Sequence, residues 1–243
     1  MKNTITILLL LSTIPGFALD KKQNYFNYER KVEVPEPMFI DLVRSLDSVK
    51  GESEFNSLFA DYSSDSKNLK WAPEVEYAFD NGKAIEFEFP GQGGNLKNYK
   101  IAYQKNITSI KNENCLQGFQ LIYESNKKFN QSESTVYHIY ALRLSHYFSF
   151  MNIAGLKFDN KNLDNRSVAW NSTFFYNYTR EVDFGLEINL ETGELGNEMY
   201  QLLPQVHLAL NNGYKIQYGF GTAMVEDKHS LLTSFRLIKE FNL

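Results

Sequence analysis

The sequence predicts an all-β protein, an up-and-down antiparallel transmembrane β-barrel of about 12 strands, with about 10 strands as the alternative. Two observations predict this fold class. Residues 200–243 have the pattern of three amphipathic strands in a row, and residues 1–18 have the pattern of a cleaved export signal. Together they indicate a chain that is exported and then crosses a membrane with its strands.

The segment 214–224 shows the strand pattern most clearly. Its odd-numbered positions are polar or small, and its apolar positions are Tyr214, Ile216, Tyr218, Phe220 and Met224. Successive side chains of a strand point to opposite faces, so this segment has one apolar face and one polar face. The segments 200–210 and 231–241 have the same alternating pattern. A tight turn at 211–213 joins the segment 200–210 to the segment 214–224.

The N-terminus predicts export and fixes the domain boundaries. It has a basic start, an apolar run at residues 5–14 and a small residue, Ala18, before the expected cleavage site. The apolar run is shorter than the roughly 20 residues that a helix needs to cross a bilayer. We therefore expect a signal peptide at 1–18, a lead-in or plug segment at 19–50 and an outer-membrane barrel at 51–243.

Composition excludes several partners and stabilising groups. Without residues 1–18 the chain has 24 basic and 29 acidic residues, a formal net charge of −5. This balance argues against nucleic acid as a partner, because phosphate binding requires clustered Lys and Arg. Cys115 is the only cysteine, which excludes an internal disulfide and the usual zinc spacing. The sequence predicts no metal and no cofactor.

Twelve segments have strand character, and the 15% aromatic content favours strands. Both termini of an outer-membrane barrel face the periplasm, so even-numbered connections should be short turns and odd-numbered connections longer external loops. Four of the five even-numbered connections are short, and residues 106–116 are the exception. The expected strands are residues 52–61, 72–79, 83–89, 97–105, 117–125, 135–145, 147–157, 167–178, 182–190, 200–210, 214–224 and 230–241.

The polar strand faces should point into the barrel, although the segments 52–61 and 147–157 are too poorly patterned to orient. One interpretation is a polar lumen with an acidic stripe that favours cations. The other is a closed interior in which acids and bases form salt-bridge ladders. The candidate lumen-lining residues are Glu74, Glu76, Glu86, Glu88, Lys100, Glu124, Arg143, Asp183, Glu187, His207, Lys215 and Arg236.

Three short stretches carry a family resemblance: 203–207, which reads Leu-Pro-Gln-Val-His, the strand with Gly219 and Gly221, and the ending at 235–238. With them the chain resembles a large group of Gram-negative outer-membrane barrels, over roughly residues 39–243. Some members are labelled transport proteins of a phenol-degradation (meta-cleavage) pathway. The alternating C-terminal tail also resembles the signal read by the barrel-insertion machinery, although it ends in Leu243 instead of an aromatic residue.

Two structures are possible for residues 19–50. Helical spacing predicts a short amphipathic helix or a plug folded into the lumen, whereas the resemblance implies an extended lead-in. The residues with helical spacing are Phe39, Leu42, Val43, Leu46 and Val49.

The function we expect is an outer-membrane channel or transporter for small solutes, with outer-membrane lipids, the insertion machinery and a small solute as partners. The alternatives are a non-conducting structural or adhesion barrel whose external loops bind partners, and a soluble periplasmic β-protein. We expect that the protein is not an enzyme. A lipid hydrolase is the catalytic alternative, since outer-membrane phospholipases use a Ser/His/Asn set, but His138, His146, His207 and His229 show no matching spacing.

Overall fold

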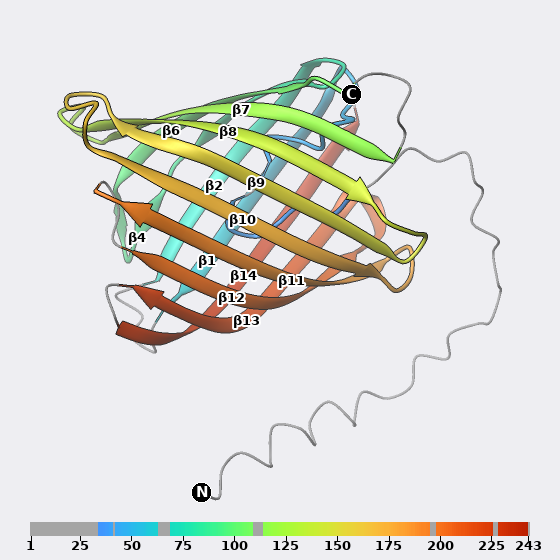
Figure 1. Ribbon diagram of the computed structural model, residues 1–243. Coiled ribbons are helices and arrows are strands. Elements are labelled where there is room, and N and C mark those ends of the chain that lie inside the picture. The colour runs from blue at the N-terminus through green and yellow to red at the C-terminus, as the bar shows by residue number, and fades with distance from the viewer. Residues whose placement is uncertain are drawn as a thin grey trace, which may run out of the picture. The chain divides into compact units, whose positions relative to one another are not determined.

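The computed structural model describes residues 34–40, 42–62, 69–108, 114–194, 198–225 and 228–242, and the expected signal peptide lies outside them. A single antiparallel sheet of 14 strands closes on itself, because β1 pairs with both β14 and β2 (Figure 1). Two of these strands, β4 (Gly91–Gln92) and β5 (Asn95–Leu96), are short additions beside β2, so the barrel has the 12 strands that the sequence predicts. No helix among the described residues is long and apolar enough to cross a membrane.

Each barrel strand pairs with its neighbours in the chain, which confirms the up-and-down order. The strands are β1 (Glu52–Asp61), β2 (Lys70–Asp80), β3 (Lys83–Glu88), β6 (Asn98–Asn106), β7 (Cys115–Asn126), β8 (Ser132–Arg143), β9 (Phe148–Asp159), β10 (Arg166–Asn177), β11 (Val182–Gly193), β12 (Met199–Ala209), β13 (Tyr214–Val225) and β14 (Lys228–Asn242).

Loop length does not distinguish the two ends of the barrel, contrary to the sequence prediction. Four even-numbered connections are short, as expected, and the β6–β7 connection remains the longer exception. However, the β7–β8 connection, predicted as long at 126–134, spans only residues 127–131, and the β13–β14 connection, predicted as moderate at 225–229, spans only residues 226–227. The reason is that strand pairing continues almost to the turn, with Val225 opposite Lys228. The longer external connections are at 62–69 and at 89–97, where the β4–β5 hairpin forms.

Outward faces are apolar and inward faces carry the charges of the acidic strands. On β2, Val75, Tyr77 and Phe79 are exposed, whereas Glu74 and Glu76 between them are buried. Alternation of this kind with a closed ring of strands is the pattern of a barrel that faces lipid outside.

Aromatic side chains cluster at both ends of the outer surface. At the end with the odd-numbered connections, Tyr99 contacts Phe89 and Phe129, with ring centroids 6.1 and 5.4 Å apart. At the other end, Tyr176 lies beside Tyr147, with centroids 6.4 Å apart. Such clusters fit the two aromatic girdles that mark membrane–water interfaces.

The interior is not polar throughout, which corrects the sequence prediction. On the inward faces of β8 and β9, Tyr137, Ile139, Ala141, Met151 and Ile153 are all buried. This patch also explains why the segment 147–157 could not be oriented from its sequence, because both of its faces carry apolar side chains. An apolar inner wall needs a cover, and the chain supplies one from its N-terminal segment.

Candidate functional site: the barrel interior

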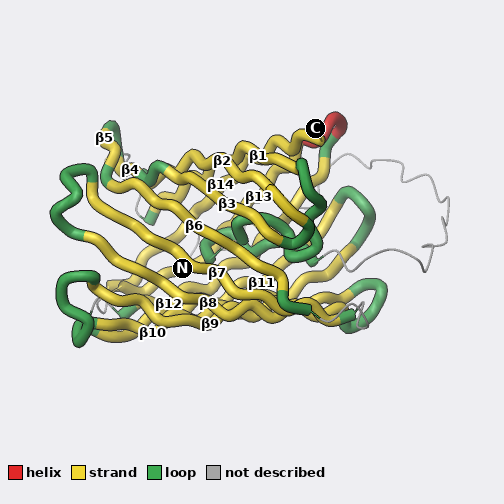
Figure 2. The backbone as a smooth tube through the Cα atoms, turned by 90° about the horizontal axis from the view of Figure 1, so that it is seen from above, coloured by secondary structure: helices red, strands yellow, loops and turns green. Residues whose placement is uncertain are grey.

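Residues 34–48 lie inside the barrel, as far as they are described, and Figure 2 shows them as a loop between the surrounding strands. We call residues 34–48 the inner segment. It is not helical, so the helix expected from the spacing of its apolar residues is wrong. The physical reason is that several of its backbone groups bond to side chains of the wall instead of to one another.

Apolar side chains of the inner segment cover the apolar patch of the wall. Leu42 and Leu46, each 1% exposed, form one buried cluster with Ile139, Met151 and Ile153. The wall makes room for this contact at Gly118, where an added Cβ would lie 2.4 Å from the Leu46 side chain. The spacing of these apolar residues therefore predicts correctly that they are buried, although the backbone is not helical.

Two smaller contacts extend the same packing around the barrel. Met38 is buried with Leu203 and Leu232, on β12 and β14. Val43 is buried against alanines on β2, β3 and β6, including Ala78. The inner segment thus touches strands from most of the circumference, which is the arrangement of a plug rather than of a tail lying along one wall.

Glu187 on β11 anchors the N-terminal part of the inner segment. Its carboxylate accepts hydrogen bonds from the backbone N–H of Met38 at 2.7 Å and of Phe39 at 3.2 Å. It also accepts from the side-chain amides of Asn171 at 2.8 Å and Asn189 at 2.9 Å. These donors give hydrogen-bond partners to a carboxylate that is fully buried away from water.

Wall side chains bind further backbone groups of the inner segment. Arg236 on β14 donates to the carbonyl of Met38 at 2.9 Å and to that of Pro37 at 3.4 Å. Gln104 on β6 accepts from Val43 N–H at 3.1 Å, and Asn106 donates to a carbonyl further along the segment at 2.7 Å. These bonds satisfy polar groups that would otherwise be buried without partners.

Arg44 reaches from the inner segment into a group of wall carboxylates. Its guanidinium forms an ion pair with Glu54 on β1 and lies 3.8 Å from Glu76 on β2. The carboxylates of Glu52 and Glu240 lie at 3.6 and 3.9 Å. Arg44 is 5% exposed, so its charge is almost entirely neutralised by protein carboxylates instead of water.

The acidic stripe expected from the sequence is a real feature of the inner wall. Glu74 and Glu76 on β2 lie opposite Glu88 and Glu86 on β3, and all four are buried. Lys100 on β6 pairs with Glu86 at 3.0 Å and also with Glu88. We call these four glutamates, together with Glu54, the acidic wall.

The acidic wall also offers ligand atoms for a cation. Carboxylate oxygens of Glu74, Glu76 and Glu86 lie within 4.8 Å of one another. Oxygen ligands at this spacing suit Ca²⁺ or Mg²⁺, while Arg44 and Lys100 supply positive charge to the same group of acids.

Glu36 shows how strongly acidic this part of the interior is. It belongs to the inner segment and is half-buried. Desolvation by burial and the nearby carboxylate of Glu54 raise the pKa of Glu36 to about 8, although Arg44 acts in the opposite direction.

All of the candidate residues from the sequence lie on inward strand faces, but they do not form one site. Five are half-buried, namely Lys100, Glu124, Arg143, Asp183 and Lys215. The buried ones are Glu74, Glu76, Glu86, Glu88, Glu187, His207 and Arg236. Whether they line a path for solute stays a prediction.

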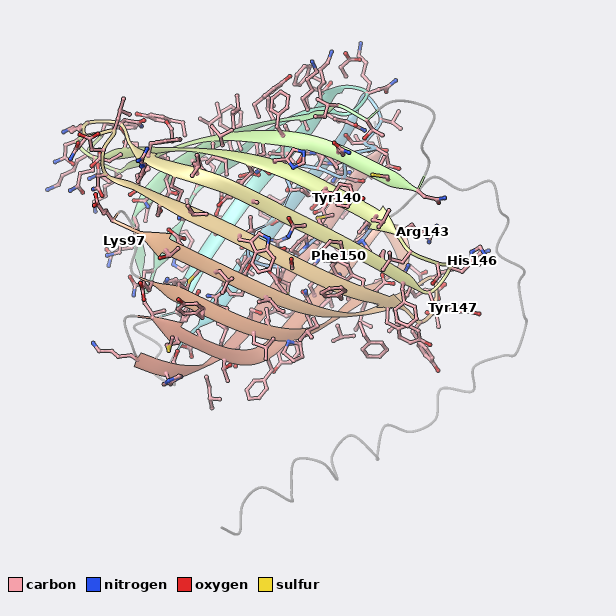
Figure 3. All side chains as sticks on the ribbon, viewed as in Figure 1. Lys97, Tyr140, Arg143, His146, Tyr147 and Phe150 are labelled. Atoms are coloured by element: carbon pink, nitrogen blue, oxygen red, sulfur yellow. The ribbon has the colours of Figure 1, made fainter. Side chains whose placement is uncertain are left out.

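Several of these residues lie away from the acidic wall. Arg143 lies at the β8–β9 end of the barrel, opposite the end that carries Lys97 (Figure 3). Glu124 lies near the other end, where Asn98 donates to it. Lys215, by contrast, lies beside the acidic wall, because it pairs with Glu240 at 2.7 Å and Glu240 lies opposite Glu54 on β1.

The histidines occupy structural positions. His207 is buried beside Gln205, with 2.9 Å between Nε2 and Oε1, and its ring contacts Phe175. His138 is exposed on the outer face of β8 and His146 lies in the β8–β9 turn. His229 lies in β14, opposite Met224 of β13.

Sequence reasoning missed the residues that join the inner segment to the wall, above all Arg44, Glu54 and Gln104. Glu54 was missed because its strand could not be oriented, and Arg44 because a lone basic residue in a lead-in has no partner visible in the sequence. The signal that could have revealed a plug is the apolar inner face of β8 and β9, since apolar side chains in a water-filled lumen would be unfavourable.

Three solved outer-membrane structures are similar to this chain in fold. The KdgM porin matches with a TM-score of 0.60 and 10% identity over 78% of this chain and 99% of that one. The NanC porin matches with a TM-score of 0.59 and 8% identity over 79% and 100%. The COG4313 outer membrane channel from Pseudomonas putida F1 matches with a TM-score of 0.57 and 8% identity over 81% and 98%. No protein-family model and no curated protein sequence matches the chain.

These likenesses confirm the barrel fold, and at such low identity they carry no more than the fold. The phenol-degradation label of the family that the sequence resembles gains no support from them.

Proposed function

We propose that this protein is a channel of the Gram-negative outer membrane that conducts small solutes and favours cations. The outer surface supports the membrane location, because exposed apolar side chains cover it between two aromatic clusters. Burying such a surface in lipid is favourable, whereas a soluble periplasmic protein would leave it in water. The export signal expected at residues 1–18 is consistent with this location.

The acidic wall is the observation that carries the cation preference. Its five glutamates lie buried on β1, β2 and β3, and the basic groups that pair with them are Arg44 and Lys100. Carboxylates that line a low-dielectric passage concentrate cations and repel anions. One structure of the KdgM porin is a complex with a disordered oligogalacturonate, an acidic solute that this wall would disfavour.

A non-conducting structural barrel is the second candidate, and the inner segment favours it. Residues 38, 42, 43 and 46 fill the interior with side chains that are at most 1% exposed. A barrel that keeps this filling permanently would carry no current, and its loops would then be the functional part.

Reversal potentials test the proposed function directly. The full-length protein is extracted from outer membranes, checked for the folded barrel by heat-modifiable gel mobility and placed in planar bilayers under a KCl gradient. We expect the reversal potential to be shifted toward the equilibrium potential of K⁺. The shift should be smaller for the Glu86→Gln/Glu88→Gln double variant. Glu181→Gln, which removes a carboxylate from the exposed β10–β11 turn, is the matched control.

Two results would contradict the proposal. A folded barrel that carries no current of inorganic ions or small aromatic solutes, both in the wild type and after deletion of residues 34–47, would favour the structural barrel. Recovery of the protein in osmotic-shock fluid would instead establish a soluble periplasmic protein.

A further inference from the structure

The inner segment is fixed to the wall in two different ways. At its C-terminal end the contacts are backbone hydrogen bonds: Gly82 N–H donates to Ser48 O at 2.9 Å, and Gly51 N–H donates to Ala78 O at 2.8 Å. These bonds fasten the end of the segment to the β2–β3 turn. Further in, the segment is held by side chains, chiefly by Arg44 and by the wall residues that bind its backbone.

The root of the segment, residues 48–51, stays attached to the β2–β3 turn. Lys50 N–H donates to Asn81 Oδ1 at 3.0 Å, in addition to the bonds of Ser48 and Gly51. Gly51 has a φ of 97°, a conformation that glycine adopts without strain. Only residues 34–47 would therefore leave the lumen, while the root, the β2–β3 turn and the barrel keep their contacts.

The contact with Arg44 differs from the others because it neutralises charge as well as holding the segment. Arg44 brings a permanent positive charge against Glu54 and Glu76, which are 4% and 0% exposed. Removing one partner of a buried ion pair is strongly unfavourable while the pair stays buried. The carboxylates left behind would then be stabilised by admitting water and mobile cations, which requires the segment to leave.

We propose that residues 34–47 are a displaceable plug, and that the ion pairs of Arg44 with Glu54 and Glu76 are the latch that keeps it in the barrel. The proposal rests on the proposed function, since the passage that the plug closes is the conduction path. In the closed state Arg44 occupies carboxylates that a passing cation would meet. Release of the latch opens the lumen and exposes the acidic wall in one step.

The test compares two variants that each remove one positive charge from the interior. Arg44→Gln removes the latch. Lys157→Gln is the matched control, because Lys157 pairs with Glu191 at 2.8 Å on the wall and neither residue belongs to the inner segment. Both full-length proteins are checked by heat-modifiable gel mobility. Hydrogen exchange of the peptide that covers residues 34–48 and single-channel current in planar bilayers are then measured.

For Arg44→Gln we expect exchange of residues 34–48 to become roughly tenfold faster or more, with a matching rise in the fraction of time that the channel is open. Lys157→Gln should leave both quantities as in the wild type. Equal exchange and equal open fractions in all three proteins would overturn the latch.

A third variant separates failure of the latch from failure of the channel. Deleting residues 34–47 removes the plug and keeps the root, which is hydrogen-bonded to the β2–β3 turn. If the folded deletion variant conducts but Arg44→Gln behaves as wild type, the channel stands and the latch is refuted. If the folded deletion variant carries no current, the proposed channel itself is refuted. A wild type that conducts as well as the deletion variant would show that the segment is no plug.

Discussion

Replacing Leu46 by alanine should loosen the inner segment, and the structure gives the size of the effect. Leu46 is 1% exposed and packs in the cluster with Ile139 and Met151, over the space left by Gly118. Truncating a buried leucine costs about 2–5 kcal/mol in protein cores. We expect about 2–3 kcal/mol, the lower part of that range, because the cost falls where the surrounding chain can collapse into the space and the inner segment is a loop.

At about 1.4 kcal/mol per factor of ten, this cost raises the undocked population roughly 30- to 150-fold. Hydrogen exchange followed by mass spectrometry on the purified barrel measures it, since the amides of Met38 and Val43 bond to wall side chains only when the segment is docked. Phe220→Ala, which truncates an exposed side chain on the lipid-facing surface, is the control. If Leu46→Ala leaves the exchange of residues 34–48 unchanged, the segment is not held by this packing and the argument fails.

Three other changes have defined outcomes. Phe220→Arg should destabilise the barrel in liposomes by up to about 2–4 kcal/mol, measured by denaturant titration, because it places a charge on the lipid face. Gly118→Val should expose the inner segment to protease, since even a Cβ at that position clashes with Leu46. Because the pKa of Glu36 is raised from 4.5 to about 8 in the folded protein, docking is strongest below pH 4.5 and weakens as the pH rises through 8. Exchange protection of residues 34–48 should therefore fall between pH 4.5 and about 8, and Glu36→Gln should remove that fall.

The fold followed from the sequence because strand alternation is a local property. In the segment 214–224 residues two positions apart lie on the same face of the strand. The face of each side chain can therefore be predicted from its near neighbours, without knowledge of distant contacts. The predicted strand agrees with β13 to within one residue. The starts of β8 and β14 were predicted too late, at residues 135 and 230 instead of Ser132 and Lys228, because polar residues near a turn resemble a loop.

The interior could be predicted only in part, because its contacts join residues far apart in the chain. The acidic stripe was visible, since Glu74 and Glu76 alternate with apolar residues on one strand and Glu86 and Glu88 do so on the next. The binding of Met38 N–H to Glu187 was not visible, because it links positions 149 residues apart and involves a backbone group that any residue possesses. The same holds for Arg44, whose partner Glu54 depends on the register of β1.

The poorly patterned strand is the most informative part of the sequence for function. A strand of an open, water-filled barrel should alternate between lipid-facing apolar and lumen-facing polar side chains. In β9, however, Met151 and Ile153 face inward and are buried, and Leu156 faces outward. Apolar residues on both faces require a dry surface on both sides, lipid on one and protein on the other. Loss of alternation in β9, beside the apolar inner face of β8, therefore indicates that something is packed in the lumen, and the buried cluster with Leu42 and Leu46 identifies the inner segment.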